Sequence, residues 1–222
     1  MSEPSIFPVI AIDGPSASGK GTVAARVAAQ LGFHYLDSGS LYRVVAHGAL
    51  QAGLDLADEP RLAALARALP VRFEADRVIY QGDDISLAIR SEAASAAASR
   101  VAVLPAVREA LLDRQRAYSQ PPGLVAEGRD MASVVFPQAQ LKVFLTASVE
   151  ARAIRRYKQL MEKGLPANIA HLSKELAERD LRDATRSVAP LKQSEGAHLL
   201  DTTHLGVDEA VSRIVGWWRG MM

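Results

Sequence analysis

The chain has 222 residues, 26 lysines and arginines against 25 aspartates and glutamates, and 49% hydrophobic residues. This length suits one globular domain with a sizeable core, and the balanced charge gives no electrostatic case for a nucleic-acid partner. The absence of cysteine excludes a disulfide framework, a thiolate zinc site and a cysteine nucleophile. With no secretory signal at its start and no apolar run near the ~20 residues that span a bilayer, the sequence predicts a cytoplasmic protein without a membrane partner.

Strands and helices are expected to alternate along the first third of the chain. Residues 8–13 form an apolar, β-branched run ended by Asp-Gly-Pro, which is typical of a short buried strand. Residues 20–31 have a helical pattern that Gly32 closes. The same reasoning predicts a strand over 34–37 and helices over 39–52 and 60–69.

The pattern changes at Pro70. The stretch VRFEADRVIYQGDDIS alternates apolar and polar residues around turn signals, which predicts two or three short antiparallel strands in an inserted subdomain. Beyond it, helices are expected over 91–104, from 105, and over 148–163, 172–187 and 208–218, and strands from 124 and over 141–146 and 198–202. Strands alternating with helices predict an α/β fold with a three-layer, doubly wound parallel sheet.

A glycine-rich loop joins the first predicted strand to the first predicted helix. Glycines allow a tight turn, N–H groups at a helix start bind phosphate oxygens, and a lysine reaches the β- and γ-phosphates as a point charge. Residue 21 is glycine where the usual motif has Ser or Thr, so Thr22 is placed near Mg²⁺ without being assigned as a direct ligand. The expected ATP-binding residues are Gly14, Pro15, Ser16, Ala17, Ser18, Gly19, Lys20, Gly21 and Thr22. The alternative is a glycine-rich turn that only connects strand and helix.

The rest of the chain favours a kinase over a GTPase switch. A GTPase needs an Asn-Lys-x-Asp guanine motif, but the one asparagine, Asn168, is followed by isoleucine. No aspartate is followed by glycine three positions later, so the Asp-x-x-Gly switch is missing as well. The five histidines show no metal-ligand spacing, which argues against a zinc hydrolase.

A kinase also needs a second anion site and positive charge around the transferring phosphoryl group. Ser38, which can cap the next helix, and Arg43 one turn further form one candidate; plain capping and a solvated charge are the alternatives. The Arg129-Asp130 pair at the end of a predicted strand forms a second candidate, and the alternative is a surface turn with a local ion pair. Residues 150–192 are a third, because they hold ten Lys and Arg against six Asp and Glu.

These segments together resemble the bacterial-type cytidylate kinases (CMP/dCMP kinases). The matching segments run in the family's order over roughly 8–204: IDGPSASGKGT, LDSGSLYR, GDDIS…IR, PAVREALL…Q, EGRDMASVVFP and ERDLRDATRSVAPL. One departure is Ala132-Ser133, where the family usually has Gly-Thr; alanine fits there if the backbone φ is negative.

The resemblance implies a nucleoside monophosphate kinase that transfers the γ-phosphate of ATP, with Mg²⁺, to CMP or dCMP. It implies one P-loop kinase domain over 1–222, with a core at 5–59, 103–150 and 195–222, an acceptor-binding insert at about 60–102 and a helical lid at about 151–192. The acceptor residues that it implies are Ser38, Arg43, Ser99, Arg108, Arg129, Asp130, Arg179, Asp183 and Arg186. Lys20 and the lid arginines Arg155, Arg156 and Arg186 are expected to stabilise the transition state.

We expect a monomer, because the sequence has no heptad pattern or obvious exposed patch. Two alternative functions stay open. One is a P-loop kinase for another small acceptor, such as shikimate or UMP. The other is a non-catalytic nucleotide-binding protein that binds ATP and releases no ADP. A panel of acceptors distinguishes them.

Overall fold

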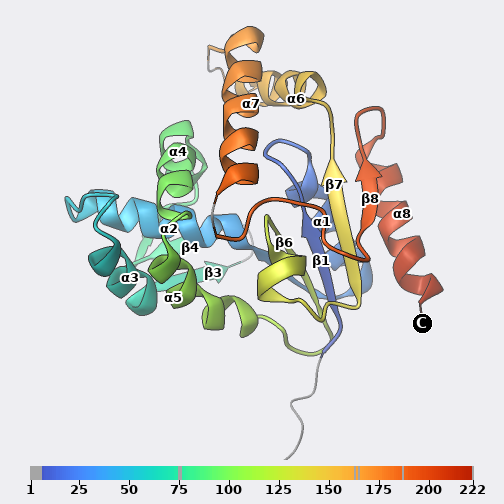
Figure 1. Ribbon diagram of the computed structural model, residues 1–222, viewed down its shortest axis with the longest axis horizontal. Coiled ribbons are helices and arrows are strands. Elements are labelled where there is room, and N and C mark those ends of the chain that lie inside the picture. The colour runs from blue at the N-terminus through green and yellow to red at the C-terminus, as the bar shows by residue number, and fades with distance from the viewer. Residues whose placement is uncertain (1–6, 75–76, 163, 165, 187, 222) are drawn as a thin grey trace, which may run out of the picture. The chain divides into compact units, whose positions relative to one another are not determined.

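The computed structural model describes residues 7–74, 77–162, 164, 166–186 and 188–221 (Figure 1). The chain forms two compact units, which are described separately below. The first comprises Met1–Leu36 and Tyr118–Met222, and the second Asp37–Ala117.

The first unit is built on a five-stranded sheet with the order β2-β6-β1-β7-β8. Its strands are β1 (Val9–Asp13), β2 (His34–Asp37), β6 (Leu124–Gly128), β7 (Leu141–Thr146) and β8 (His198–Asp201). β1 lies between β6 and β7 and is parallel to both, with Asp13 opposite Gly128 and Phe144. All five residues of β1 and of β6 are buried, which explains why each strand begins with a continuous apolar run instead of an alternating pattern.

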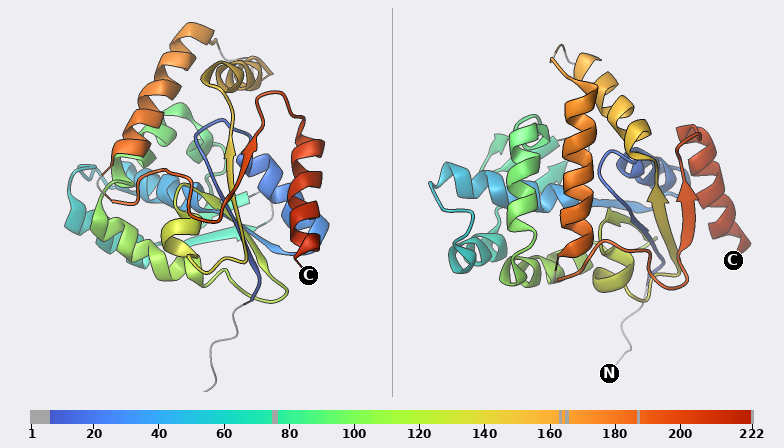
Figure 2. Two further views of the ribbon diagram at one scale, coloured as in Figure 1. Left: turned by 45° about the vertical axis from the view of Figure 1, so that its right-hand side comes forward. Right: turned by 45° about the horizontal axis from the view of Figure 1, so that its top comes forward.

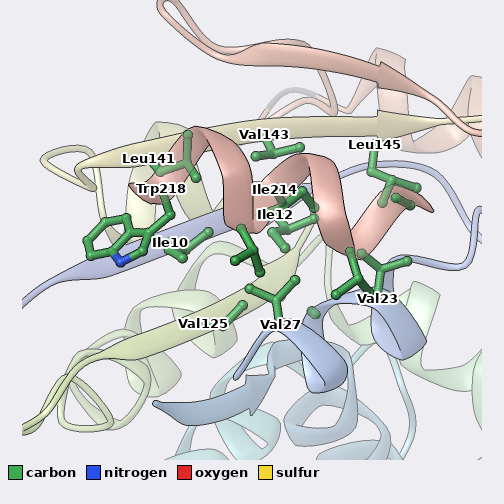
Figure 3. Close-up of a cluster of buried hydrophobic side chains, with 14 of the residues drawn as sticks. Ile10, Ile12, Val23, Val27, Val125, Leu141, Val143, Leu145, Ile214 and Trp218 are labelled. Carbon is green, nitrogen blue, oxygen red and sulfur yellow. The ribbon is translucent and has the colours of Figure 1, made fainter. Parts of the chain in front are cut away.

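Helices α1 (Lys20–Leu31) and α8 (Val207–Gly220) pack together over this sheet (Figure 3). Val23 and Val27 of α1 and Ile214 of α8 point into one cluster with strand side chains such as Ile10 and Val143. These helix residues recur every three or four positions, so one face of each helix is apolar. The cluster fixes β1 and α1, and therefore the loop that joins them.

A second helical pair, α6 (Val149–Glu162) and α7 (Ile169–Thr185), lies beyond the end of β7 (Figure 2). The two helices pack through Ala153, Leu172 and Leu176, and Ala17 of the glycine-rich loop packs against this small cluster. The loop is therefore in contact with the helical pair that the resemblance identifies as a lid.

The second unit combines helices with a three-stranded antiparallel sheet of order β3-β4-β5. Val71 pairs with Tyr80 and Ile79 with Asp84. Its elements are α2 (Ser38–Gln51), α3 (Glu59–Ala68), β3 (Val71–Glu74), β4 (Arg77–Tyr80), β5 (Asp83–Asp84), η1 (Ala88–Arg90), α4 (Glu92–Val101) and α5 (Pro105–Arg116).

The predicted α/β class, with a parallel main sheet and a small antiparallel one, is confirmed. Two local details differ from the expectations. The helix expected over 91–104 forms as α4 but already ends at Val101. The π-helical turn η2 (Met131–Val135), for which the sequence made no prediction, follows β6. In the described part of the chain, no helix is long and apolar enough to cross a membrane.

Candidate functional site

The glycine-rich loop of residues 14–19 is shaped by two glycines and by a close approach to β7. A Cβ on Gly14 would lie 2.0 Å from the carbonyl oxygen of Leu145, so no side chain fits there. Gly19 has a φ of 90° and forms the N-cap of α1. The backbone dipoles of α1 favour an anion at this end of the helix, and the first turn carries no acidic residue that would repel one.

Lys20 lies against Glu127 at the carboxyl end of β6. Its Nζ is 3.4 Å from Glu127 Oε2 and donates to the carbonyl of Pro15, and both charged side chains are buried. A Cβ on Gly21 would lie 3.2 Å from Glu127 Oε1. Glycine at position 21 thus leaves room for this carboxylate, which gives a physical reason for the departure from the usual motif.

Arg129 connects the loop to α7. Its Nη2 donates to Ser16 Oγ at 2.7 Å, and its Nε donates to Asp183 Oδ2 at 2.8 Å. Burial raises the pKa of Asp183, but the charge and hydrogen bond of Arg129 and the charges of Arg179 and Arg186 lower it further, so the pKa lies below its usual value. Four predicted acceptor residues therefore lie within one electrostatic cluster.

Two arginines of α6 hold the loop by its carbonyl groups. Arg152 is buried, donates to the carbonyls of Ala147 and Ser16 at 3.0 and 3.1 Å, and pairs with Asp180 through both Nη atoms. Arg155 donates to the carbonyl of Ser18, at 3.1 Å, and to the backbone and hydroxyl of Thr202. The predicted catalytic residue Arg155 is thus a support of the loop here.

Asp13 fixes the turn that follows Arg129 and Asp130. Its two carboxylate oxygens accept hydrogen bonds from the N–H groups of Met131 and Ala132, each at 2.8 Å. Burial raises the pKa of Asp13 to about 6, although both hydrogen bonds lower it. Ala132 is not among the residues with positive φ, so alanine fits in place of the family's usual glycine.

The remaining predicted residues of the first unit lie on the same elements. Asp130 is buried and forms the N-cap of η2. Arg186 is the C-cap of α7 and donates to the carbonyl of Ala189, while Arg179 and Arg156 are half-buried on α7 and α6. Thr22 is exposed in the first turn of α1.

The second unit holds the other four predicted acceptor residues. Arg43 lies 3.4 Å from Asp37 Oδ2 near the start of α2, and the guanidinium of Arg108 lies 5.9 Å from the centre of the Tyr42 ring. Arg108 Nη1 also donates to the carbonyl of Ala102, and Ser99 Oγ to that of Ser95. Ser38 was expected to cap α2, but this was wrong: Asp37 is the cap and accepts from the N–H of Ser40, while Ser38 is the first helical residue.

The site contains residues that the sequence analysis did not select. Glu127 carried a signal, because it ends a buried strand beside Arg129. Arg152 belongs to the basic stretch over 150–192, but nothing in the sequence showed that it contacts Ser16, which lies 136 positions away. Asp13, Asp180 and Thr202 carried no signal that singled them out, because their partners lie far away in the sequence.

Comparison with known proteins identifies the group to which this site belongs. Residues 10–219 match the family model described as cytidylate kinase. The chain belongs to the cytidylate kinase family. A relative named cytidylate kinase from Ralstonia nicotianae is 57% identical over 213 residues, which are 96% of this chain and 93% of the relative. Another from Chromobacterium violaceum is 58% identical over 211 residues, or 95% of each chain.

Solved structures add a likeness of fold alone. The structure of an uncharacterized protein from Eubacterium ventriosum is similar over 96% of this chain and 98% of that protein's chain. Its TM-score is 0.55 and its sequence identity is 12%. The family match thus comes from the sequence, and it confirms the resemblance to cytidylate kinases.

Proposed function

We propose that this chain transfers the γ-phosphate of ATP to CMP or dCMP and releases ADP with CDP or dCDP. Membership of the cytidylate kinase family and the presence of the phosphate loop support this reaction. The observation that carries it is the contact of Arg129 with Ser16: an arginine of the expected acceptor site lies on the loop that is built to hold the donor.

The loop residues 14–22 are proposed to bind the ATP phosphates through backbone N–H groups, with Lys20 as the charge on the β- and γ-phosphates. Lys20 is now paired with Glu127, and a phosphate would compete for the same ammonium group. The attacking oxygen of the acceptor phosphate is already an anion near neutral pH, because its second pKa is about 6. The reaction therefore needs no general base from this chain.

We propose an acceptor-binding role for each of nine residues. Those in the first unit are Arg129, Asp130, Arg179, Asp183 and Arg186, and those in the second are Ser38, Arg43, Ser99 and Arg108. Arginines suit this task because their planar groups bind phosphate oxygens in pairs. Arg155, Arg156 and Arg186 are proposed to supply positive charge during the transfer.

Mg²⁺ is proposed to bind beside Lys20. The carboxylate of Glu127 faces the first turn of α1 at Gly21, and Thr22 offers a hydroxyl on the same turn. One carboxylate with phosphate oxygens and water is a donor set that Mg²⁺ prefers. When bound, the ion neutralises charge on the β- and γ-phosphates. The monomeric state and the cytoplasmic location stay predictions, the first open to light scattering of the purified protein.

The proposed reaction is tested by measuring ADP release from ATP·Mg²⁺ with CMP, dCMP, UMP, AMP, GMP and shikimate. We expect fast release with CMP and dCMP, weak release with UMP and none with the others. The Lys20→Ala variant controls for contaminating kinases, and its turnover should fall by about 10²–10³ because it lacks a preorganised charge. Faster turnover with another acceptor, or equal release by the variant, would contradict the proposal.

A further inference from the structure

Ser16 is the point at which two arginines from different parts of the chain meet the phosphate loop. Its Oγ accepts from Arg129 at 2.7 Å, and its carbonyl oxygen accepts from Arg152 at 3.1 Å. Ser16 is only 9% exposed, so these bonds are shielded from water. Hydrogen bonds from a charged donor at such a position are stronger than those between neutral groups.

The same two arginines bind neighbouring carboxylates of α7. Arg129 pairs with Asp183 and Arg152 with Asp180, and these aspartates lie three positions apart, on adjacent turns of one helical face. Ser16 is therefore linked through each arginine to the helix that carries Arg179 and has Arg186 as its C-cap.

The hydroxyl of Ser16 differs in this respect from the other serine hydroxyl of the loop. Ser18 Oγ donates to the carbonyl of Pro15, within the loop itself. Phosphate binding by such loops uses backbone N–H groups, and the Ser16 hydroxyl is engaged with Arg129 instead. Loss of this hydroxyl should therefore affect Arg129 more than it affects the donor phosphates.

We propose that Ser16 is a positioning residue for the acceptor: its hydroxyl holds the guanidinium group of Arg129 in the orientation that binds the acceptor phosphate. This inference rests on the proposed function. Arg129 reaches Ser16 through Nη2 and Asp183 through Nε, so two contacts on different nitrogens fix the plane of the guanidinium group. Removing one of them leaves the charge in place and frees its orientation.

The test is a double-mutant cycle between Ser16→Ala and Arg129→Ala, with KM and kcat measured for each substrate. In the wild-type background, Ser16→Ala should raise the KM for CMP about ten- to a hundredfold, the range expected for one hydrogen bond to a charged group, and change the KM for ATP less than twofold. In the Arg129→Ala background, the same substitution should change the KM for CMP less than twofold, because the arginine through which Ser16 acts is missing.

Ser194→Ala is the matched control, since it removes a hydroxyl whose buried Oγ has no hydrogen-bond partner in the described structure. It should leave both KM values unchanged. If Ser16→Ala does not fold, Arg129→Lys tests the same point. This variant keeps the charge but lacks the planar guanidinium group, and it should raise the KM for CMP by a similar factor.

A larger effect of Ser16→Ala on ATP than on CMP, equal effects in both backgrounds, or a wild-type KM for CMP in Arg129→Lys would overturn the inference. A wild-type enzyme that prefers another acceptor contradicts the proposed function instead. The same cycle, run with that acceptor, then decides the role of Ser16.

Discussion

At the scale of single residues, Asp13 shows how a buried carboxylate holds the site together. It ends β1 and accepts two backbone hydrogen bonds from residues 118 and 119 positions further along the chain. It is 2% exposed, and the loss of water raises its pKa to about 6. The ordinary value for this group is 3.8, so the folded protein binds this proton more tightly than the unfolded chain does.

This raised pKa predicts an unusual dependence of stability on pH. Because the folded state holds the proton more tightly, the contribution of Asp13 is most favourable below about pH 4 and is lost as the pH rises through about 6. The shift corresponds to about 3 kcal/mol at 1.36 kcal/mol per pKa unit. Between pH 7 and pH 4, the wild-type protein should therefore gain most of this, about 2 kcal/mol of unfolding free energy, relative to Asp13→Asn.

Urea unfolding of both proteins at a series of pH values measures this difference. Asp113→Asn, a change at an exposed aspartate, controls for the removal of one negative charge. Parallel stability curves for the wild-type protein and Asp13→Asn from pH 7 to pH 4 would show that the buried carboxylate does not behave as described.

At the scale of elements, α6 contributes to the site through a buried arginine. Arg152 lies in the first turn of the helix, and its guanidinium group is satisfied by two carbonyls and by Asp180. The side chain is 3% exposed and that of Asp180 27%, so the pair is partly shielded from solvent. Such a pair contributes little to the free energy of unfolding, but removal of one partner leaves buried polar groups without hydrogen bonds and is strongly destabilising.

Arg152→Met should therefore lower the unfolding free energy by about 3 kcal/mol, although methionine replaces much of the apolar stem. Arg26→Met is the matched control, because Arg26 pairs with Asp208 on the surface, where the two side chains are 50% and 87% exposed. This control should change stability by less than about 1 kcal/mol. Chemical denaturation of both variants tests the contrast, and equal losses would contradict it.

At the scale of the whole molecule, the loop is held in place by the core of the first unit. Ile214 of α8 is fully buried and lies in the cluster that joins α1 and α8 to the sheet (Figure 3). None of the residues proposed to bind substrate belongs to this cluster. A substitution in this core should therefore lower the stability of the protein without changing its affinity for substrate.

Ile214→Ala is expected to lower the unfolding free energy by about 2–5 kcal/mol through the loss of buried apolar surface and the cavity that remains. The KM for CMP, measured well below the unfolding temperature, should stay within twofold of the wild-type value. Leu199→Ala provides the control, since Leu199 is 56% exposed on β8 and should change stability little. A core variant with full stability would show that this cluster does not hold the unit together.

The sequence predicted most of the helices and strands and most of the charged residues that the site contains, but not the contacts between them. The strand over 8–13 and the helix over 20–31 were recognisable because apolar runs, periodicity and Gly32 are local signals. The cap of α2 was assigned one residue late, because Asp37 and Ser38 are both good capping residues and sequence alone does not rank their backbone conformations.

What the sequence by itself determined is the α/β class, the phosphate loop and the family, all of which depend on short contiguous motifs. Only the tertiary structure decided the partners of those motifs: Glu127 against Lys20, Arg129 on Ser16, and Arg155 on the carbonyl of Ser18. The physical reason is that motifs reflect local backbone geometry, while charges and hydrogen bonds are satisfied by whatever the fold brings near. Segments more than a hundred positions apart become neighbours only when the sheet is assembled.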